Sequence, residues 1–102
     1  MGTMLNAICR NCGFTYGTIY FGSGMIERTP KVPAIQKDTG EFVVAEISDD
    51  PNLLFYHQRE MYKDPIKDYG IQNLDISLNP SGNLCPACQE YAMDFVVTGN
   101  FD

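Results

Sequence analysis

The sequence predicts a small α+β domain in which short strands and one helix are held together by four cysteines. All four cysteines occur in two Cys-x-x-Cys pairs, Cys9/Cys12 near the start and Cys85/Cys88 near the end. Several β-rich segments recur along the chain, and one segment has helical spacing. We therefore expect a single domain over residues 1–102, β-rich around the two pairs, with a helix-containing insert over residues 28–83.

Four segments favour β-strands. Residues 14–21 are rich in Thr, Tyr, Ile and Phe, and residues 41–47 follow the turn signal Asp38-Thr39-Gly40. Residues 74–78 and 91–98 alternate apolar with polar or small residues, as a half-buried strand does. Residues 28–35 contain two prolines and predict an irregular, extended crossing.

The insert contains the segment for which we predict a helix. Asp50-Pro51 offers an N-cap followed by proline at the first helical position, and Pro65 must end the helix. Between them, five residues with a largely apolar character fall on one helical face: Leu54, Phe55, Gln58, Met61 and Tyr62.

The spacing of the cysteines points to one metal site. Two residues between cysteines let both thiolates of a turn face one ion, and two such turns supply four ligands, as tetrahedral zinc requires. Cys9, Cys12, Cys85 and Cys88 are therefore the predicted ligands of zinc, with iron left open because ligand type alone does not separate the two metals. Gly13 follows the first pair, where the chain can need a positive φ to leave the turn, and glycine adopts that φ without a clash. Gln89 follows the second pair, so we expect the chain either to leave that turn differently or to be strained there.

Two other uses of the cysteines compete with a metal site. Disulfides belong to oxidising compartments, but residues 1–8 contain neither the basic nor the apolar region of a signal peptide, so a cytoplasmic location is expected. Cys85-Pro86-Ala87-Cys88 is similar to a glutaredoxin-like redox motif, which lies where a strand enters a helix. Here a polar turn precedes the motif and a β-rich segment follows it, so metal binding is favoured.

The segment from Cys9 to Gly17, together with Cys85-Pro86-Ala87-Cys88, resembles the two knuckles of zinc ribbons and rubredoxins. It also resembles small uncharacterised bacterial proteins that open with a Cys-x-x-Cys-Gly knuckle and close with a second Cys-x-x-Cys pair. The resemblance implies a four-cysteine metal site on a zinc-ribbon-like scaffold. The 72 residues between the two pairs differ from the rubredoxin pattern, in which the knuckles lie much closer together.

Charge bears on the partners that we expect. The formal net charge is −6, whereas nucleic-acid binders concentrate Lys and Arg against the phosphates. We therefore expect a protein partner. A membrane span is not expected, because no apolar run approaches the roughly 20 residues that it needs. The alternative is a nucleic-acid-binding zinc ribbon that uses the basic residues of the first part of the chain: Arg10, Arg28, Lys31 and Lys37.

No set of nucleophile, base and orienting group can be assembled from the sequence. Asp38-Thr39-Gly40 has the letters of the aspartic-protease motif, but Lys37 precedes it where that motif has a buried apolar strand. His57 is the only histidine and falls beside the apolar face of the predicted helix. We therefore predict that the protein is not an enzyme. The leading hypothesis is a zinc-stabilised protein-interaction module, and a rubredoxin-like electron carrier is a further alternative.

Overall fold

The computed structural model describes residues 2–22, 29–66, 70–73 and 76–101, and almost all regular structure within them is β. The strands are β1 (Gly2–Cys9), β2 (Thr15–Phe21), β3 (Lys31–Gln36), β4 (Phe42–Glu46), β5 (Leu53–Phe55), β6 (Ile71–Asn73), β7 (Ile76–Leu78), β8 (Asn83–Leu84) and β9 (Tyr91–Phe101). One 3₁₀ turn, η1, covers Arg59–Met61. Within the described residues, no helix has the length and apolar character needed to cross a membrane.

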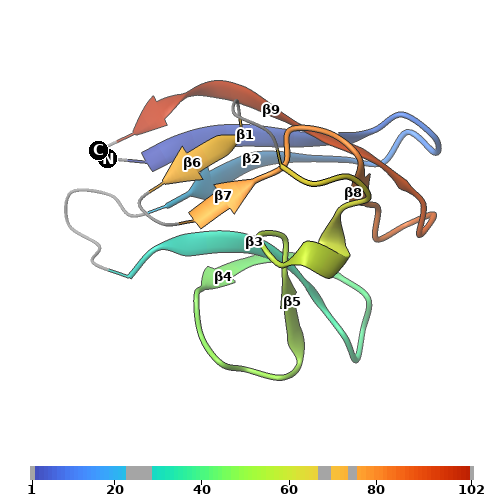
Figure 1. The fold of residues 1–102 in the computed structure, drawn as a ribbon, viewed down its shortest axis with the longest axis horizontal. Helices are drawn as coiled ribbons and strands as arrows, with labels where there is room; N and C mark the ends of the chain where they lie inside the picture. Colours follow the sequence, from blue (N-terminus) through green and yellow to red (C-terminus); the bar gives the residue numbers. More distant parts are fainter. Residues whose placement is uncertain (1, 23–28, 67–69, 74–75, 102) are drawn as a thin grey trace.

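The strands form three antiparallel sheets (Figure 1). The largest has the order β2-β1-β9-β8, so the first and last strands of the chain are neighbours. β4-β3-β5 forms a second sheet, and the hairpin β6-β7 forms a third. Gly2 lies opposite Phe101 in the β1–β9 pair and Cys9 lies opposite Met93, so the two strands run side by side along the whole of β1.

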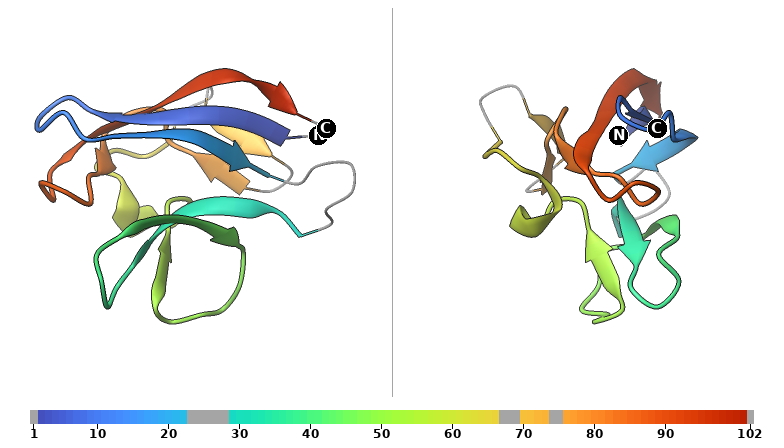
Figure 2. Two further views of the ribbon diagram at one scale, coloured as in Figure 1. Left: turned by 180° about the vertical axis from the view of Figure 1, so that it is seen from behind. Right: turned by 90° about the vertical axis from the view of Figure 1, so that its right-hand side faces the viewer.

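The core lies where the three sheets meet. Both smaller sheets lie on the same side of the β2-β1-β9-β8 sheet (Figure 2). Its inner face contributes Leu5, Ile19 and Phe95, and the smaller sheets contribute residues such as Phe55 and Leu78; all five are buried. The core is therefore shared between the sheets, and no sheet has a separate core of its own.

β1 was not predicted from the sequence. Leu5, Ala7 and Cys9 are buried and alternate with Asn6 and Ile8, which lie on the opposite face. This alternation is the signal that could have identified the strand. Without β1 the large sheet has no centre, because β2 and β9 both pair with it.

Residues 31–35 of the segment predicted as an irregular, extended crossing (28–35) belong to β3, the centre of the second sheet, and Arg28 lies outside the described residues. The buried Pro33 lacks a backbone donor, which a central strand normally needs. Its carbonyl accepts from the backbone N–H of Tyr56, just past the end of β5, at 2.9 Å. The N–H that Pro33 lacks would point to the same side, where the pairing with β5 ends, so the pairing of Pro33 with Val44 of β4 does not depend on it.

The predicted helix is wrong, and with it the α+β class and the helix-containing insert. The Asp50 side chain accepts from the backbone N–H of Asn52 at 2.9 Å, and the Asp50 carbonyl accepts from Leu53 at 3.2 Å, so Asp50 closes a turn. Residues 53–55 then pair with β3, and η1 supplies the only helical turn in the described residues. Tertiary pairing has overridden local helical periodicity.

The other predicted strands agree with the structure where it describes them. β2, β4 and β9 correspond to the predicted segments 14–21, 41–47 and 91–98. β7 covers the end of the segment 74–78, whose first two residues lie outside the described part of the chain. The predicted turn Asp38-Thr39-Gly40 joins β3 to β4, and Gly40 has a φ of 74°.

Tyr56 joins the second sheet to the largest one. Its side chain is fully buried, and its ring contacts Phe42 of β4 and Phe95 of β9 at centroid distances of 5.6 and 5.3 Å. Its hydroxyl donates to the backbone carbonyl of Leu84 in β8. Burial raises the pKa of Tyr56 well above its usual range, so the hydroxyl remains a donor at any physiological pH.

We expect Tyr56→Phe to lower the free energy of unfolding by about 1–2 kcal/mol, because the ring packing is kept while the Leu84 carbonyl loses its donor. Denaturant unfolding at constant metal content measures this change. Tyr91→Phe is the matched control: its hydroxyl donates to the Glu60 carbonyl at an exposed position, so its loss should change stability by less than about 0.5 kcal/mol. Equal effects of the two variants would contradict the assigned role.

Candidate metal centre

The four cysteines lie together at one end of the large sheet. Their sulfur atoms are all within 4.8 Å of one another. Cys9 ends β1 and Cys12 lies in the turn after it, whereas Cys85 and Cys88 lie in the turn between β8 and β9. The pairing of β1 with β9 brings these two turns together, although 72 residues separate them in the sequence.

The sulfur positions match a tetrahedral ion. Cys9 Sγ lies 3.7 Å from Cys88 Sγ, and Cys12 Sγ lies 3.6 Å from Cys85 Sγ. Four sulfurs at about 2.3 Å from a tetrahedral zinc ion are about 3.8 Å apart. No two of these sulfurs are bonded to each other, and both spacings are well above the roughly 2.05 Å of a disulfide bond. The cluster can therefore hold a metal ion.

The two turns, here called the first knuckle (residues 9–14) and the second knuckle (residues 85–90), share one backbone pattern. The N–H of Cys9 donates to the Phe14 carbonyl at 2.8 Å, and the N–H of Gly13 donates to the Cys9 carbonyl at 3.2 Å. In the second knuckle the N–H of Cys85 donates to the Glu90 carbonyl, and that of Gln89 to the Cys85 carbonyl, both at 2.9 Å. Each first cysteine is thus held at both its N–H and its carbonyl.

The backbone of Gln89 shows how the chain leaves the second knuckle without a glycine. Gly13 and Gln89 occupy equivalent positions and have φ values of 81° and 60°. The second knuckle therefore leaves its turn in the same way as the first, and Gln89 is the only non-glycine residue with positive φ among those that the structure describes. The sequence left two outcomes open, a different exit from the turn or backbone strain at Gln89. The structure shows strain, because a residue with a side chain disfavours positive φ.

The surroundings favour charge at one sulfur and oppose it at another. The Asn11 side chain and the backbone N–H of Glu90 hydrogen-bond the Cys88 sulfur and lower its pKa to about 6. Burial raises the pKa of the Cys85 thiol to about 12. The N–H of Asn11 also lies 3.4 Å from the Cys9 sulfur. A cation at the centre would offset the cost of the buried Cys85 thiolate, because metal binding replaces the protons.

The basic residues of the alternative prediction that the structure describes lie in different parts of the fold. Arg10 lies in the first knuckle, with its Nε 3.2 Å from the Asp94 carboxylate. Lys31 begins β3, and Lys37 follows its other end, so the strand separates them. Arg28 lies outside the described residues. The three that the structure describes therefore lie in the first knuckle and at the two ends of β3.

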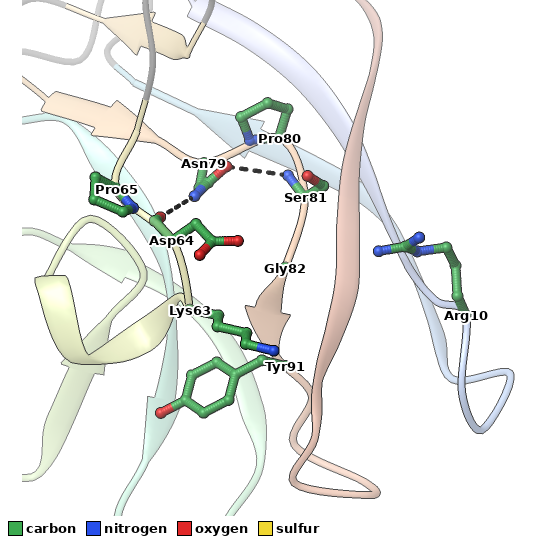
Figure 3. A pocket seen from close by; sticks show the side chains of 9 residues that line it. All are labelled: Arg10, Lys63, Asp64, Pro65, Asn79, Pro80, Ser81, Gly82 and Tyr91. Atoms are coloured by element: carbon green, nitrogen blue, oxygen red, sulfur yellow. Dashed lines mark hydrogen bonds between the residues drawn. The ribbon is translucent and has the colours of Figure 1, made fainter.

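A polar cleft of about 340 Å³ lies beside the knuckles (Figure 3). Arg10, Lys63 and Asp64 bring charges of both signs to its wall. The Asn79 side chain donates to the Asp64 carbonyl at 2.8 Å and accepts from the N–H of Ser81 at 3.3 Å, which fixes the shape of that wall (Figure 3). These hydrogen bonds satisfy the Asn79 amide internally, so the residue stabilises the loop before β8.

No protein-family model, no curated protein and no solved structure matches the chain. The similarity to zinc ribbons and rubredoxins therefore rests on the two Cys-x-x-Cys knuckles alone. Within the described residues these cysteines are the only cluster of three or more side chains of metal-binding type.

We expect Gln89→Gly to raise the free energy of unfolding by about 1 kcal/mol, because glycine adopts positive φ without a steric penalty. Gly13→Ala is the matched control in the first knuckle and should lower stability by about the same amount. A Cβ on Gly13 would meet no atom within 4 Å, so this change isolates the backbone cost. Thermal unfolding of the metal-loaded protein measures both, and a destabilised Gln89→Gly variant would contradict the strain assigned here.

Proposed function

We propose that Cys9, Cys12, Cys85 and Cys88 bind one zinc ion and that this ion has a structural role. The observation that supports this most directly is the set of four sulfurs within 4.8 Å, with two spacings that match tetrahedral edges. The shared backbone pattern of the knuckles adds support, because it holds the first cysteine of each pair in the same orientation.

The proposal assigns no reaction to the protein. Four thiolates complete the coordination sphere of a tetrahedral ion and leave no coordination position for water or substrate. An ion at this centre closes a loop that contains most of the chain, so it limits the freedom of the unfolded chain and couples metal binding to folding. A centre of four thiolates requires reduced cysteines, so we propose a reducing compartment such as the cytoplasm.

We further propose that the domain is a protein–protein interaction module. Its net charge of −6 disfavours contact with phosphates, and the described basic residues are dispersed. A second candidate is an electron carrier with iron in the same four thiolates. The exposure of Cys12 favours this candidate, because electron transfer requires a metal ligand near the surface.

Native mass spectrometry of freshly purified protein should show one zinc ion per chain, and chelation should expose four thiols to alkylation. Removal of the ion should abolish the cooperative thermal transition. Structural zinc binding contributes about 10–16 kcal/mol in small sites, which is comparable with the whole stability of a domain of this size. Cys9→Ser and Cys88→Ser should have the same effect as the chelator.

The chelator should cause no additional loss of structure in Cys9→Ser, which serves as the control for nonspecific effects of chelation. A metal-free wild-type chain that kept its thermal transition would contradict the structural role. A red, oxidisable centre containing iron would instead support the electron carrier.

The nucleic-acid alternative predicts binding that weakens as the salt concentration rises. We expect no measurable binding of labelled DNA or RNA at about 0.15 M salt, because few phosphate contacts oppose the net repulsion. The titration is repeated with Lys31→Glu/Lys37→Glu. Sub-micromolar binding that falls steeply with salt and is lost in this variant would support a nucleic-acid-binding ribbon.

A further inference from the structure

The last strand extends well beyond the strand that pairs with its second edge. β9 contains 11 residues and pairs with β1 as far as Phe101, whereas its pairing with β8 stops at Met93. Figure 1 shows β8 beside only the start of β9. The carbonyl of Pro80, in the loop before β8, accepts from the N–H of Phe95 at 3.0 Å. In the described part of the chain, nothing pairs with this edge of β9 over residues 96–101, here called the free edge.

The strand register shows which backbone groups point out of the free edge. Along an antiparallel pair, residues alternate between those that hydrogen-bond the partner strand and those that point away from it. Phe95 points away from β1, because its N–H donates to Pro80. The partners of Phe95, Val97 and Asn100 are alternate residues of β1, so the three share this orientation, and Thr98 is the extra residue of a bulge. The N–H and C=O groups of Val97 and Asn100 therefore point out of the sheet at the free edge.

The side chains along the free edge leave it open to another strand. The free edge contains neither a charged residue nor a proline, which are two common means of protecting an edge strand. Val96 and Val97 lie on opposite faces and are 45 and 52% exposed. Leu5, the β1 partner of Val97, is fully buried, so the covering of the inner face ends between these two residues. An added strand would cover both valines.

The other edge of the large sheet, formed by β2, is turned toward the second sheet. Tyr16 of β2 contacts the Phe42 ring of β4 at a centroid distance of 4.6 Å. Gly22, directly after β2, pairs with Lys31 of β3 through backbone hydrogen bonds of 2.8 and 3.0 Å. Among the described elements, β9 has no such neighbour beyond Phe95. The edge formed by β9 is therefore the more accessible of the two.

We propose that the free edge binds an extended segment of a partner protein, which joins the large sheet as a further strand. The inference deepens the proposed interaction role and rests on it for the existence of a partner. Outward N–H and C=O groups on an extended strand are matched by the backbone of another extended strand. Val96 and Val97 flank that backbone on both faces, so the segment carries apolar, β-branched side chains beside them.

Charge decides which kind of segment fits. The chain has a net charge of −6, so a segment with basic residues is attracted and an acidic one is repelled. A second copy of this chain could offer its own free edge, but it would bring the same net negative charge with it. The proposed occupant is therefore a basic, β-branched segment of a different protein.

Proline substitutions at two edge positions provide a matched pair. Val97→Pro removes an outward N–H from the free edge and keeps the pairing with β1, because proline is tolerated where a strand N–H points to solvent. Val44 of β4 lies opposite Pro33, whose carbonyl points away from β4 toward Tyr56, so the Val44 N–H also points out of its sheet. Val44→Pro therefore makes the same chemical change at an edge outside the proposed site.

The probe is a blocked heptapeptide with lysine at both ends and alternating valine and threonine between them. It is titrated into the isotope-labelled, zinc-loaded chain and followed by NMR. We expect the amide resonances of the free edge to shift and the Val97 N–H to exchange more slowly. The dissociation constant should be about 0.1–1 mM, because few backbone groups pair and the peptide loses freedom on binding. Val97→Pro should weaken binding about tenfold or more, and Val44→Pro less than about twofold.

Two control peptides keep the test independent of the protein variants. The same peptide N-methylated at its five inner residues keeps every side chain but loses the backbone donors, so it should not bind. Glutamate in place of both lysines should weaken binding, because the chain is acidic. Zinc content and the thermal transition, measured on every protein sample, establish that each variant is folded.

Four results would overturn the proposal. The first is the absence of any shift at the free edge, and the second is equal binding of the N-methylated peptide. The third is equal weakening by Val44→Pro and Val97→Pro. The fourth is a shift of the free-edge resonances with protein concentration alone, which would identify a second copy as the occupant. Peptide binding that maps to other residues would refute the free edge and leave the interaction role standing, and the zinc content reports the metal role separately.

Discussion

The pairing of β1 with β9 is the constraint on which the rest of this structure depends. It places the end of the first strand beside the start of the last one, and the knuckles lie at that point. Four sulfurs from distant parts of the chain then come within 4.8 Å. The same pairing forms the centre of the large sheet, against which the two smaller sheets pack. The candidate metal centre and the core therefore require the same long-range contact.

The second knuckle is also supported from the insert. Tyr56 follows β5 and donates to the carbonyl of Leu84, the residue before Cys85. Its ring lies between Phe42 of β4 and Phe95 of β9. A single buried side chain thus connects the second sheet, the large sheet and a cysteine turn. The position of Cys85 depends in this way on the folding of residues that lie far from it in the sequence.

The sequence predicted the cysteine cluster because ligand spacing is a local property with a specific chemical purpose. It predicted β2, β4 and β9 for a similar reason, since β-branched and aromatic residues are concentrated there. The helix was wrong because Asp50-Pro51 begins a turn as readily as a helix, and the pairing of β5 with β3 decided between them. Residues far apart in sequence determine such pairings, so local periodicity could not reveal them. Gln89 differs from both cases: the sequence identified the unusual position, but only the backbone φ showed how the chain accommodates it.

The four sulfurs are not equally accessible, since Cys9 and Cys85 are buried while Cys12 is exposed and Cys88 is half-buried. An ion held there would have an inner pair of ligands within the core and an outer pair facing solvent. A competing ligand in solution can approach only the outer pair, so exchange would begin with the sulfur of Cys12. The rate at which metal leaves would then reflect local opening of the first knuckle, whereas the affinity would reflect the folding of the whole domain. Kinetic lability and thermodynamic stability of the centre would thus be controlled by different parts of the chain.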